Sequence, residues 1–158
     1  MFGTDVATID LASHEDMVAY GRELSGELQA GDVVLLHGDL GAGKTTLVQG
    51  IAAGLGVEEA IQSPTFGLVA DHRGRLASGE AVSIHHLDLY RLESPDDLEG
   101  LGYEQYIAPA DGVSMIEWPE RANDWLPDSF MLLKINHGVS GGRRIERSWH
   151  QVKSSPSS

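Results

Sequence analysis

The feature that most constrains this chain is a glycine-rich segment that follows a short apolar run. Residues 38–45 read GDLGAGKT and match the phosphate-loop pattern G-x-x-x-x-G-K-[ST] at every specified position. The apolar residues 32–37 predict a buried strand before the loop, and residues 44–55 predict a helix closed by Gly54 and Gly56. This order predicts an α/β fold with a nucleoside triphosphate site, and a plain glycine-rich turn is the less specific interpretation.

The residue types of the loop suit phosphate binding. Glycines let backbone N–H groups approach phosphate oxygens without a Cβ in the way, and the helix that begins here adds its positive N-terminal dipole. Lys44 is placed to neutralise the β- and γ-phosphates, and the Thr45 hydroxyl is placed to ligate Mg²⁺. The predicted nucleotide-binding residues of the loop are Gly38, Asp39, Leu40, Gly41, Ala42, Gly43, Lys44 and Thr45.

Length and composition predict one intracellular domain. The 158 residues suffice for a single core, so we expect one domain over residues 1–152 and a disordered tail over 153–158. The chain has no cysteine, which excludes disulfides, thiolate metal sites and cysteine nucleophiles and agrees with a reducing cytoplasm. No segment approaches the roughly 18 apolar residues of a membrane span, and residues 1–5 do not resemble a signal peptide. We therefore expect a soluble cytoplasmic protein.

The charge is strongly negative and unevenly distributed. The formal net charge is −13, yet the C-terminal end carries Arg143, Arg144, Arg147 and Lys153 against Glu146. An acidic body repels a polyphosphate backbone, so autonomous binding of DNA or RNA is not expected. The basic end allows a contact with RNA or an acidic partner, but a solvated strand edge explains it more simply.

The remaining patterns alternate between helix and strand. A capping-box start at Ser13 precedes apolar residues at helical spacing, namely Met17, Tyr20, Leu24 and Leu28. Residues 94–99 start a further helix. Strands are predicted at 82–89, 113–117, 130–135 and 143–149, the last returning antiparallel, with turns at 71–79 and 136–142. This order predicts a three-layer α/β sandwich whose mixed sheet is parallel at its centre and has hairpins at its margins.

Two acids at strand ends are candidates for the metal and catalytic chemistry. A triphosphate site needs a second acid at the end of a buried strand, on the edge that carries the phosphate loop. Glu117 and Asp88 both directly follow apolar runs and fit this position. A strand-terminal acid is otherwise only solvated surface, and a transition-metal site of His86 with Asp88 lacks an evident third ligand.

Four pieces of sequence narrow the family. They are GDLGAGKTT at 38–46, SPTF at 63–66, HLDLYRL at 86–92 and EWPE at 117–120. In this order the pieces resemble the bacterial TsaE family, the small P-loop ATPase of tRNA threonylcarbamoyladenosine biosynthesis, over about residues 11–145. The phosphate loop is shared by many families, whereas the other three pieces together are distinctive.

The resemblance implies roles for the loop residues and for both acids. Lys44, Thr45 and Thr46 match phosphate- and magnesium-binding positions. Asp88 matches an acid needed for hydrolysis, and Glu117 matches the acid associated with Mg²⁺. The implied catalytic residues are thus Lys44, Asp88 and Glu117, and the implied metal ligands are Thr45, Asp88 and Glu117.

Other positions also match the family. Residues 63–66, including Ser63 and Thr65, match a mobile switch loop over the γ-phosphate, and Trp118 matches a tryptophan beside the nucleotide. Trp118 also suits core or rim packing, and Arg91 suits charge stabilisation, partner docking or a surface ion pair. Met17 stands where family members commonly carry a threonine near the nucleotide, and a methionine cannot supply that hydroxyl hydrogen bond.

The resemblance also implies a partner-dependent activity. Family members bind ATP and Mg²⁺ and assist the TsaD–TsaB pair, which transfers threonylcarbamoyl to the adenosine next to the anticodon. Hydrolysis resets that complex between turnovers and does not drive the transfer itself, and tRNA is reached only through the complex. From the residues themselves we expect slow hydrolysis without the partner, because the site offers Arg91 but is otherwise acidic. The acidic body of the chain agrees with a partner that holds the tRNA.

Two other function classes compete with this one. A small-molecule phosphotransferase is compatible with the loop and the size, but residues 92–142 hold only Arg121 and Lys134 and provide no basic lid. A signalling GTPase should carry an Asn-Lys-x-Asp guanine reader, which the sequence lacks.

Overall fold

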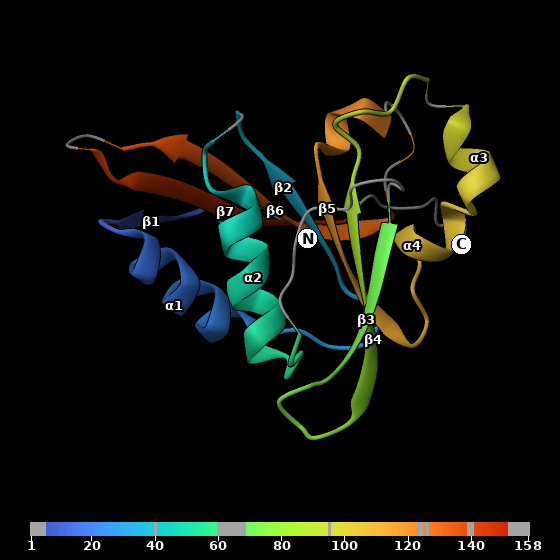
Figure 1. Ribbon diagram of the computed structural model, residues 1–158, viewed down its shortest axis with the longest axis horizontal. Helices are drawn as coiled ribbons and strands as arrows, with labels where there is room; N and C mark the ends of the chain where they lie inside the picture. Colours follow the sequence, from blue (N-terminus) through green and yellow to red (C-terminus); the bar gives the residue numbers. More distant parts are fainter. Residues whose placement is uncertain are drawn as a thin grey trace.

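The computed structural model describes residues 6–39, 41–59, 69–94, 96–122, 125, 127–138 and 141–151. Within them, the strands form one sheet in the spatial order β1-β7-β6-β2-β5-β4-β3 (Figure 1). The strands are β1 (Ala7–Leu11), β2 (Val33–His37), β3 (Val69–Arg75), β4 (Ala81–Asp88), β5 (Gly112–Glu117), β6 (Ser129–His137) and β7 (Arg143–Gln151). The helices are α1 (His14–Ser25), α2 (Lys44–Gly54), α3 (Asp97–Leu101), α4 (Glu104–Ile107) and the 3₁₀ turn η1 (Pro119–Ala122).

The centre of the sheet is parallel. β2 pairs in parallel with both β5 and β6, and β4 pairs in parallel with β5. In this register Leu36 lies beside Glu117, and Glu117 lies beside Asp88. The carboxyl ends of β2, β4 and β5 therefore meet at one edge, the edge at which the chain leaves β2 for the phosphate loop. The buried strands predicted at 32–37 and 113–117 are confirmed.

The margins of the sheet are antiparallel, as the alternating pattern predicts. β6 and β7 form one hairpin, and β3 and β4 form the other. The predicted turn at 71–79 is too long, because residues 71–75 continue β3 and pair with β4 as far as Arg75 opposite Ala81. β3 is an edge strand whose side chains alternate in exposure, so polar residues are tolerated on its open face and imitate a turn in the sequence.

The sequence patterns did not predict one of the strands, β1. β1 pairs antiparallel with β7 along Ala7–Leu11 and forms the edge of the sheet opposite to β3. Its five residues are mostly exposed, so the period of apolar residues is weak there. The strand exists because β7 offers a free row of backbone hydrogen-bonding groups, which is a tertiary condition.

Helices α1 and α2 pack on each other and on one face of the sheet. Ser13 caps α1 by accepting a hydrogen bond from the Asp16 amide, as the capping pattern predicts. The two helices approach closely at glycines, because a Cβ on Gly50 would overlap the Val18 carbonyl oxygen. The core on this face includes buried residues from both helices and from the strands, among them Leu24, Leu47 and Ile51.

The opposite face is covered by α3, α4 and η1, on the right of Figure 1. Their core contains Leu87, Leu98, Tyr103 and Ile116. The two clusters on opposite faces confirm the predicted three-layer α/β sandwich. In the part of the chain that the structure describes, no helix is both long and apolar enough to cross a membrane.

Candidate nucleotide-binding site

The phosphate loop connects β2 to α2 at the carboxyl edge of the sheet. Gly41 and Gly43 adopt positive φ angles of 80° and 109°, which favour glycine because a Cβ is strained there. Gly38 has a different constraint, since a Cβ would lie 2.7 Å from the Ile135 carbonyl oxygen on β6. Lys44 begins α2, so the loop amides and the positive end of the helix dipole lie together. Leu40 lies outside the described residues.

Lys44 is buried within this loop. Its Nζ donates to the Asp39 carbonyl oxygen at 2.9 Å and also to that of Gly38. The same ammonium lies 4.1 Å from the centroid of the Trp118 ring. Burial lowers the pKa of Lys44, while the carboxylates of Glu117, Glu120, Asp88 and Asp39 oppose this shift. The positive charge of the Lys44 ammonium therefore lies at the mouth of the loop.

Glu117 links the phosphate loop to the sheet. Thr45 Oγ1 donates toward both carboxylate oxygens of Glu117 at 3.2 Å. His86 Nε2 lies 2.6 Å from Glu117 Oε2, and both side chains are buried. Because an ionised carboxylate only accepts hydrogen bonds, His86 donates from Nε2 to Glu117. From the sequence we considered His86 only as a possible metal ligand together with Asp88. In the structure its imidazole contacts Glu117 instead.

Asp88 is the second acid at this edge. Its Oδ1 accepts a hydrogen bond from the Tyr90 amide at 3.1 Å. Burial raises the pKa of Asp88, and the nearby Glu117 carboxylate raises it further. Asp88 shares a hollow of about 300 Å³ with the loop and with Glu117; its lining residues are Gly41, Gly43, Lys44, Thr45, Thr46, Asp88, Tyr90, Glu117 and Trp118.

The oxygen donors of this hollow suit Mg²⁺. A threonine hydroxyl and two carboxylates are hard oxygen ligands, and the lysine beside them supplies the charge that phosphates require. The sequence predicted these residues from three separate segments, and the parallel register brings them to one edge. Ser63 and Thr65, the predicted switch-loop contacts, lie outside the described residues.

Trp118 forms an aromatic wall beside Lys44. Its backbone has a φ of 59°, which is strained for a bulky residue and is typical of functional sites. The ring lies 4.8 Å from that of Tyr90, and the Arg121 guanidinium lies 5.3 Å from the Tyr90 ring centroid. Arg91, another sequence candidate, is exposed. Trp118 thus packs at the rim of the site and also contacts the Lys44 ammonium.

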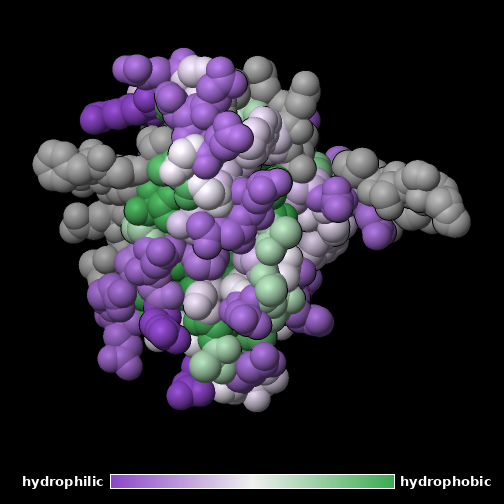
Figure 2. All heavy atoms as spheres, turned by 90° about the vertical axis from the view of Figure 1, so that its right-hand side faces the viewer, coloured by the Kyte–Doolittle hydropathy of each residue, from purple (hydrophilic) through white to green (hydrophobic). Residues whose placement is uncertain are grey.

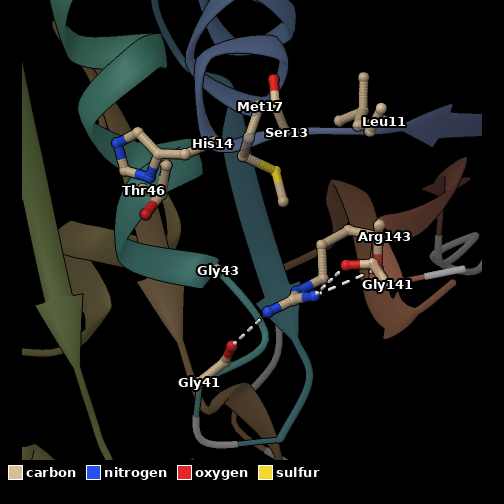
Figure 3. A pocket seen from close by; sticks show the side chains of 11 residues that line it. Leu11, Ser13, His14, Met17, Gly41, Gly43, Thr46, Gly141 and Arg143 are labelled. Atoms are coloured by element: carbon tan, nitrogen blue, oxygen red, sulfur yellow. Dashed lines mark hydrogen bonds between the residues drawn. The ribbon is translucent and has the colours of Figure 1, made fainter.

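A second hollow, of about 340 Å³, lies on the other side of the loop (Figure 3). Its lining joins the end of β1, the start of α1, the loop and the start of β7, and Gly41, Gly43 and Thr46 line both hollows. Met17 is only 2% exposed, and its methyl group would lie 2.9 Å from a Cβ on Gly43. The core-packing interpretation of Met17 therefore holds, and its sulfur end also borders the hollow.

Arg143 is the residue of this site whose position the sequence failed to indicate. Its Nε donates to the Ala42 carbonyl oxygen at 2.9 Å, and a terminal nitrogen donates to that of Gly41 at 3.2 Å. The sequence assigned this arginine to a solvated strand edge. No local pattern could have corrected this, because 101 residues separate Arg143 from Ala42.

Comparisons with known proteins identify the family of this chain. The family model described as threonylcarbamoyl adenosine biosynthesis protein TsaE matches residues 11–145. A relative named tRNA threonylcarbamoyladenosine biosynthesis protein TsaE from a Nostoc species is 41% identical over 90% of this chain and 89% of the relative. The protein of the same name from Mycobacterium tuberculosis is 42% identical over 92% and 89%. The crystal structure of YdiB from Bacillus subtilis superposes with a TM-score of 0.75 at 25% identity, over 97% of this chain and 90% of that one.

Proposed function

Because the chain belongs to the TsaE family, we propose that it is the Mg²⁺-dependent ATP-binding and hydrolysing subunit required for threonylcarbamoylation of tRNA adenosine. Membership itself carries a role in tRNA threonylcarbamoyladenosine biosynthesis. The single observation that supports the nucleotide chemistry is the meeting of Lys44, Thr45, Asp88 and Glu117 around one phosphate loop.

Each of these residues has a task in ATP binding. The loop amides and Lys44 hold the β- and γ-phosphates, and the nucleoside extends into the second hollow beside Met17 and Thr46. Thr45 and Glu117 hold Mg²⁺, which neutralises charge that develops on the phosphate oxygens. His86 keeps the Glu117 carboxylate turned toward Thr45.

Asp88 has the position of a residue that orients the attacking water. It lies beside Glu117 in the register of β4 and β5, on the phosphate side of the sheet edge. Only its carboxylate form accepts a proton, and the raised pKa moves the formation of that form to higher pH. Hydrolysis should therefore increase with pH through the titration of Asp88.

The charge around the site supports dependence on a partner. Among the described residues that line the phosphate hollow there is no arginine. Glu120 acts on Lys44 electrostatically. Further exposed acids follow Asp88 in the sequence, namely Glu93, Asp96, Asp97, Glu99 and Glu104, and the face that carries α3 and α4 is largely hydrophilic (Figure 2). An arginine supplied in trans is worth about 10³–10⁵ in rate in comparable enzymes.

A basic docking surface on the partner would match this acidic rim and steer association. From the family membership, we propose that the partner is a TsaD–TsaB type transferase complex. In this proposal the complex binds tRNA, and hydrolysis by the present chain resets the complex between turnovers. The rim explains why the chain alone should hydrolyse ATP slowly, since anionic side chains oppose further negative charge in the transition state.

The decisive experiment measures ATP binding and turnover with and without the partner pair. Titration calorimetry with ADP and Mg²⁺ should detect binding to the wild type and none to Lys44→Ala, because the loop amides cannot replace the lost positive charge. Lys134→Ala removes an exposed lysine from β6 and serves as the control. ATP turnover should increase when the partner pair is added and decrease again at high salt.

Two results would contradict the proposal. Equal ADP affinity in Lys44→Ala and the wild type would remove the phosphate-loop assignment. Fast turnover by the chain alone, unaffected by the partner at any salt concentration, would indicate an autonomous enzyme. Transfer of phosphate to a small acceptor instead of water would favour the alternative of a phosphotransferase.

A further inference from the structure

Arg143 connects two segments that are distant in the chain. It is the first residue of β7 and directly follows the turn between β6 and β7. Its guanidinium donates to the Gly41 and Ala42 carbonyl oxygens of the phosphate loop, at 3.2 and 2.9 Å. It also donates to the carbonyl oxygens of Gly141 and Gly142, at 3.3 and 3.1 Å. Figure 3 shows the side chain reaching across the hollow from the hairpin to Gly41.

The neighbouring arginines of β7 have different partners. Arg144 pairs with Asp10, and Arg147 pairs with Glu27, so both neutralise a carboxylate. The four hydrogen bonds of Arg143 in the described part of the chain all go to backbone carbonyls. Carbonyl dipoles therefore stabilise the charge of the Arg143 guanidinium without neutralising it, and the charge acts on the loop beside it.

These contacts control the direction of the loop amides. A peptide unit is planar, and its carbonyl and N–H groups point in opposite directions. Fixing the Ala42 carbonyl toward Arg143 therefore turns the Gly43 N–H away from Arg143. Fixing the Gly41 carbonyl does the same for the Ala42 N–H, which donates to the Asp39 carbonyl oxygen at 3.0 Å. The loop makes internal hydrogen bonds, from the Ala42 N–H to the Asp39 carbonyl oxygen and from Lys44 Nζ to the Gly38 and Asp39 carbonyl oxygens. Gly41 and Gly43 have no Cβ to restrict rotation, so Arg143 adds a restraint from outside the loop at these two positions.

We infer that Arg143 is a positioning residue that holds the phosphate loop in its anion-binding conformation by clamping the Gly41 and Ala42 carbonyls to the β6–β7 hairpin. This inference rests on the proposed nucleotide binding at the loop. Without the clamp, only a fraction of the molecules present the loop amides correctly, and the apparent affinity decreases by that fraction. The effect should be specific to phosphate binding, because the Glu117 and Thr45 pair lies on the other side of the loop.

The test compares three arginine positions on the same strand. Arg143→Gln should weaken ADP binding about ten- to hundredfold in titration calorimetry. Arg143→Lys keeps the charge, but one ammonium cannot bridge both pairs of carbonyls, so its affinity should stay clearly below that of the wild type. Arg144→Gln removes an exposed ion pair and should leave ADP affinity unchanged. Arg147→Gln should lower stability without changing affinity, which separates a folding defect from a loop defect.

A second measurement does not require nucleotide. Hydrogen exchange of the peptide that contains residues 41–46 should accelerate in Arg143→Gln and not in Arg144→Gln. Wild-type affinity in Arg143→Lys would show that only charge matters and would overturn the clamp, as would unchanged exchange and affinity in Arg143→Gln. If the wild type itself binds no ADP, the proposed function fails, whereas the exchange experiment still decides the role of Arg143.

Discussion

Replacing His86 tests how the Glu117 carboxylate is held. His86 Nε2 lies 2.6 Å from Glu117 Oε2, His86 is completely buried, and Glu117 is 2% exposed. The other imidazole nitrogen, Nδ1, is buried and has no partner among the described residues. A glutamine can place its amide nitrogen near the Nε2 position, whereas an asparagine reaches only the Nδ1 position. His86→Gln and His86→Asn therefore differ mainly in whether Glu117 keeps its donor.

The structure gives the size of the expected effect. Removing the donor leaves a buried carboxylate oxygen short of one hydrogen bond, which costs about 1–3 kcal/mol. The upper end of this range approaches the roughly 3–5 kcal/mol by which stability falls when one member of a buried charged pair is removed. We therefore expect His86→Asn to lower the free energy of unfolding by about 2 kcal/mol more than His86→Gln does. For a chain of this length that difference corresponds to a Tm difference of about 4–8 °C.

The assay combines stability with metal dependence. Urea unfolding gives the stability difference, and ADP titrations at several Mg²⁺ concentrations show whether the carboxylate still faces Thr45. His86→Asn should need more Mg²⁺ for half-maximal binding, and His86→Gln should remain near the wild type. His85→Asn is the matched control, because His85 pairs with the exposed Asp71 at 2.7 Å, where such a contact contributes little.

One pattern of results would refute this reasoning. If the glutamine and asparagine variants lose equal stability and equal Mg²⁺ response, the Nε2 hydrogen bond does not hold Glu117, and His86 is only a core residue. A loss in His85→Asn as large as that in His86→Asn would indicate a general effect of replacing histidines on β4.

Three further predictions concern helix packing, alkaline stability and the two acids. Gly50→Ala should destabilise the fold by about 1–3 kcal/mol in urea unfolding, because the new Cβ overlaps a carbonyl oxygen of α1, whereas Gly100→Ala, with open space around it, should not. Burial raises the pKa of Tyr103 to about 12, so the folded chain keeps a proton that the unfolded chain loses. Between pH 10 and pH 12 this should lower the free energy of unfolding by about 2 kcal/mol, and the decrease should be smaller by this amount in Tyr103→Phe. Glu117→Gln should shift the Mg²⁺ dependence of ATP turnover, while Asp88→Asn should retain ATP binding and lose hydrolysis, and identical Mg²⁺ titration curves would contradict these separate roles.

Local patterns predicted the central elements well. The apolar runs that became β2 and β5 are buried on both faces, and such runs are continuous in sequence. The acids at the ends of β4 and β5 could be predicted because a strand-terminal carboxylate interrupts the apolar pattern at a definite residue. The phosphate loop could be predicted because its glycines and lysine are contiguous and their spacing is strict.

Marginal elements were harder to predict. β1 and residues 71–75 of β3 are edge segments with one exposed face, and their polar residues resemble turns. Their backbone groups find partners only after β7 and β4 are in place. Short helices such as α4, with four residues, contain too few turns to show a period of 3.6 residues.

The order of residues along the chain determined the class of the fold, the phosphate loop and the two acids, because each depends on neighbours within about ten positions. The partners of His86 and Arg143 depend on the tertiary structure instead. His86 reaches Glu117 only because β4 and β5 are adjacent, and Arg143 reaches Ala42 only because β6 and β7 return beside the loop. Hydrogen-bond direction and burial are properties of assembled neighbours, and no spacing within one segment contains them.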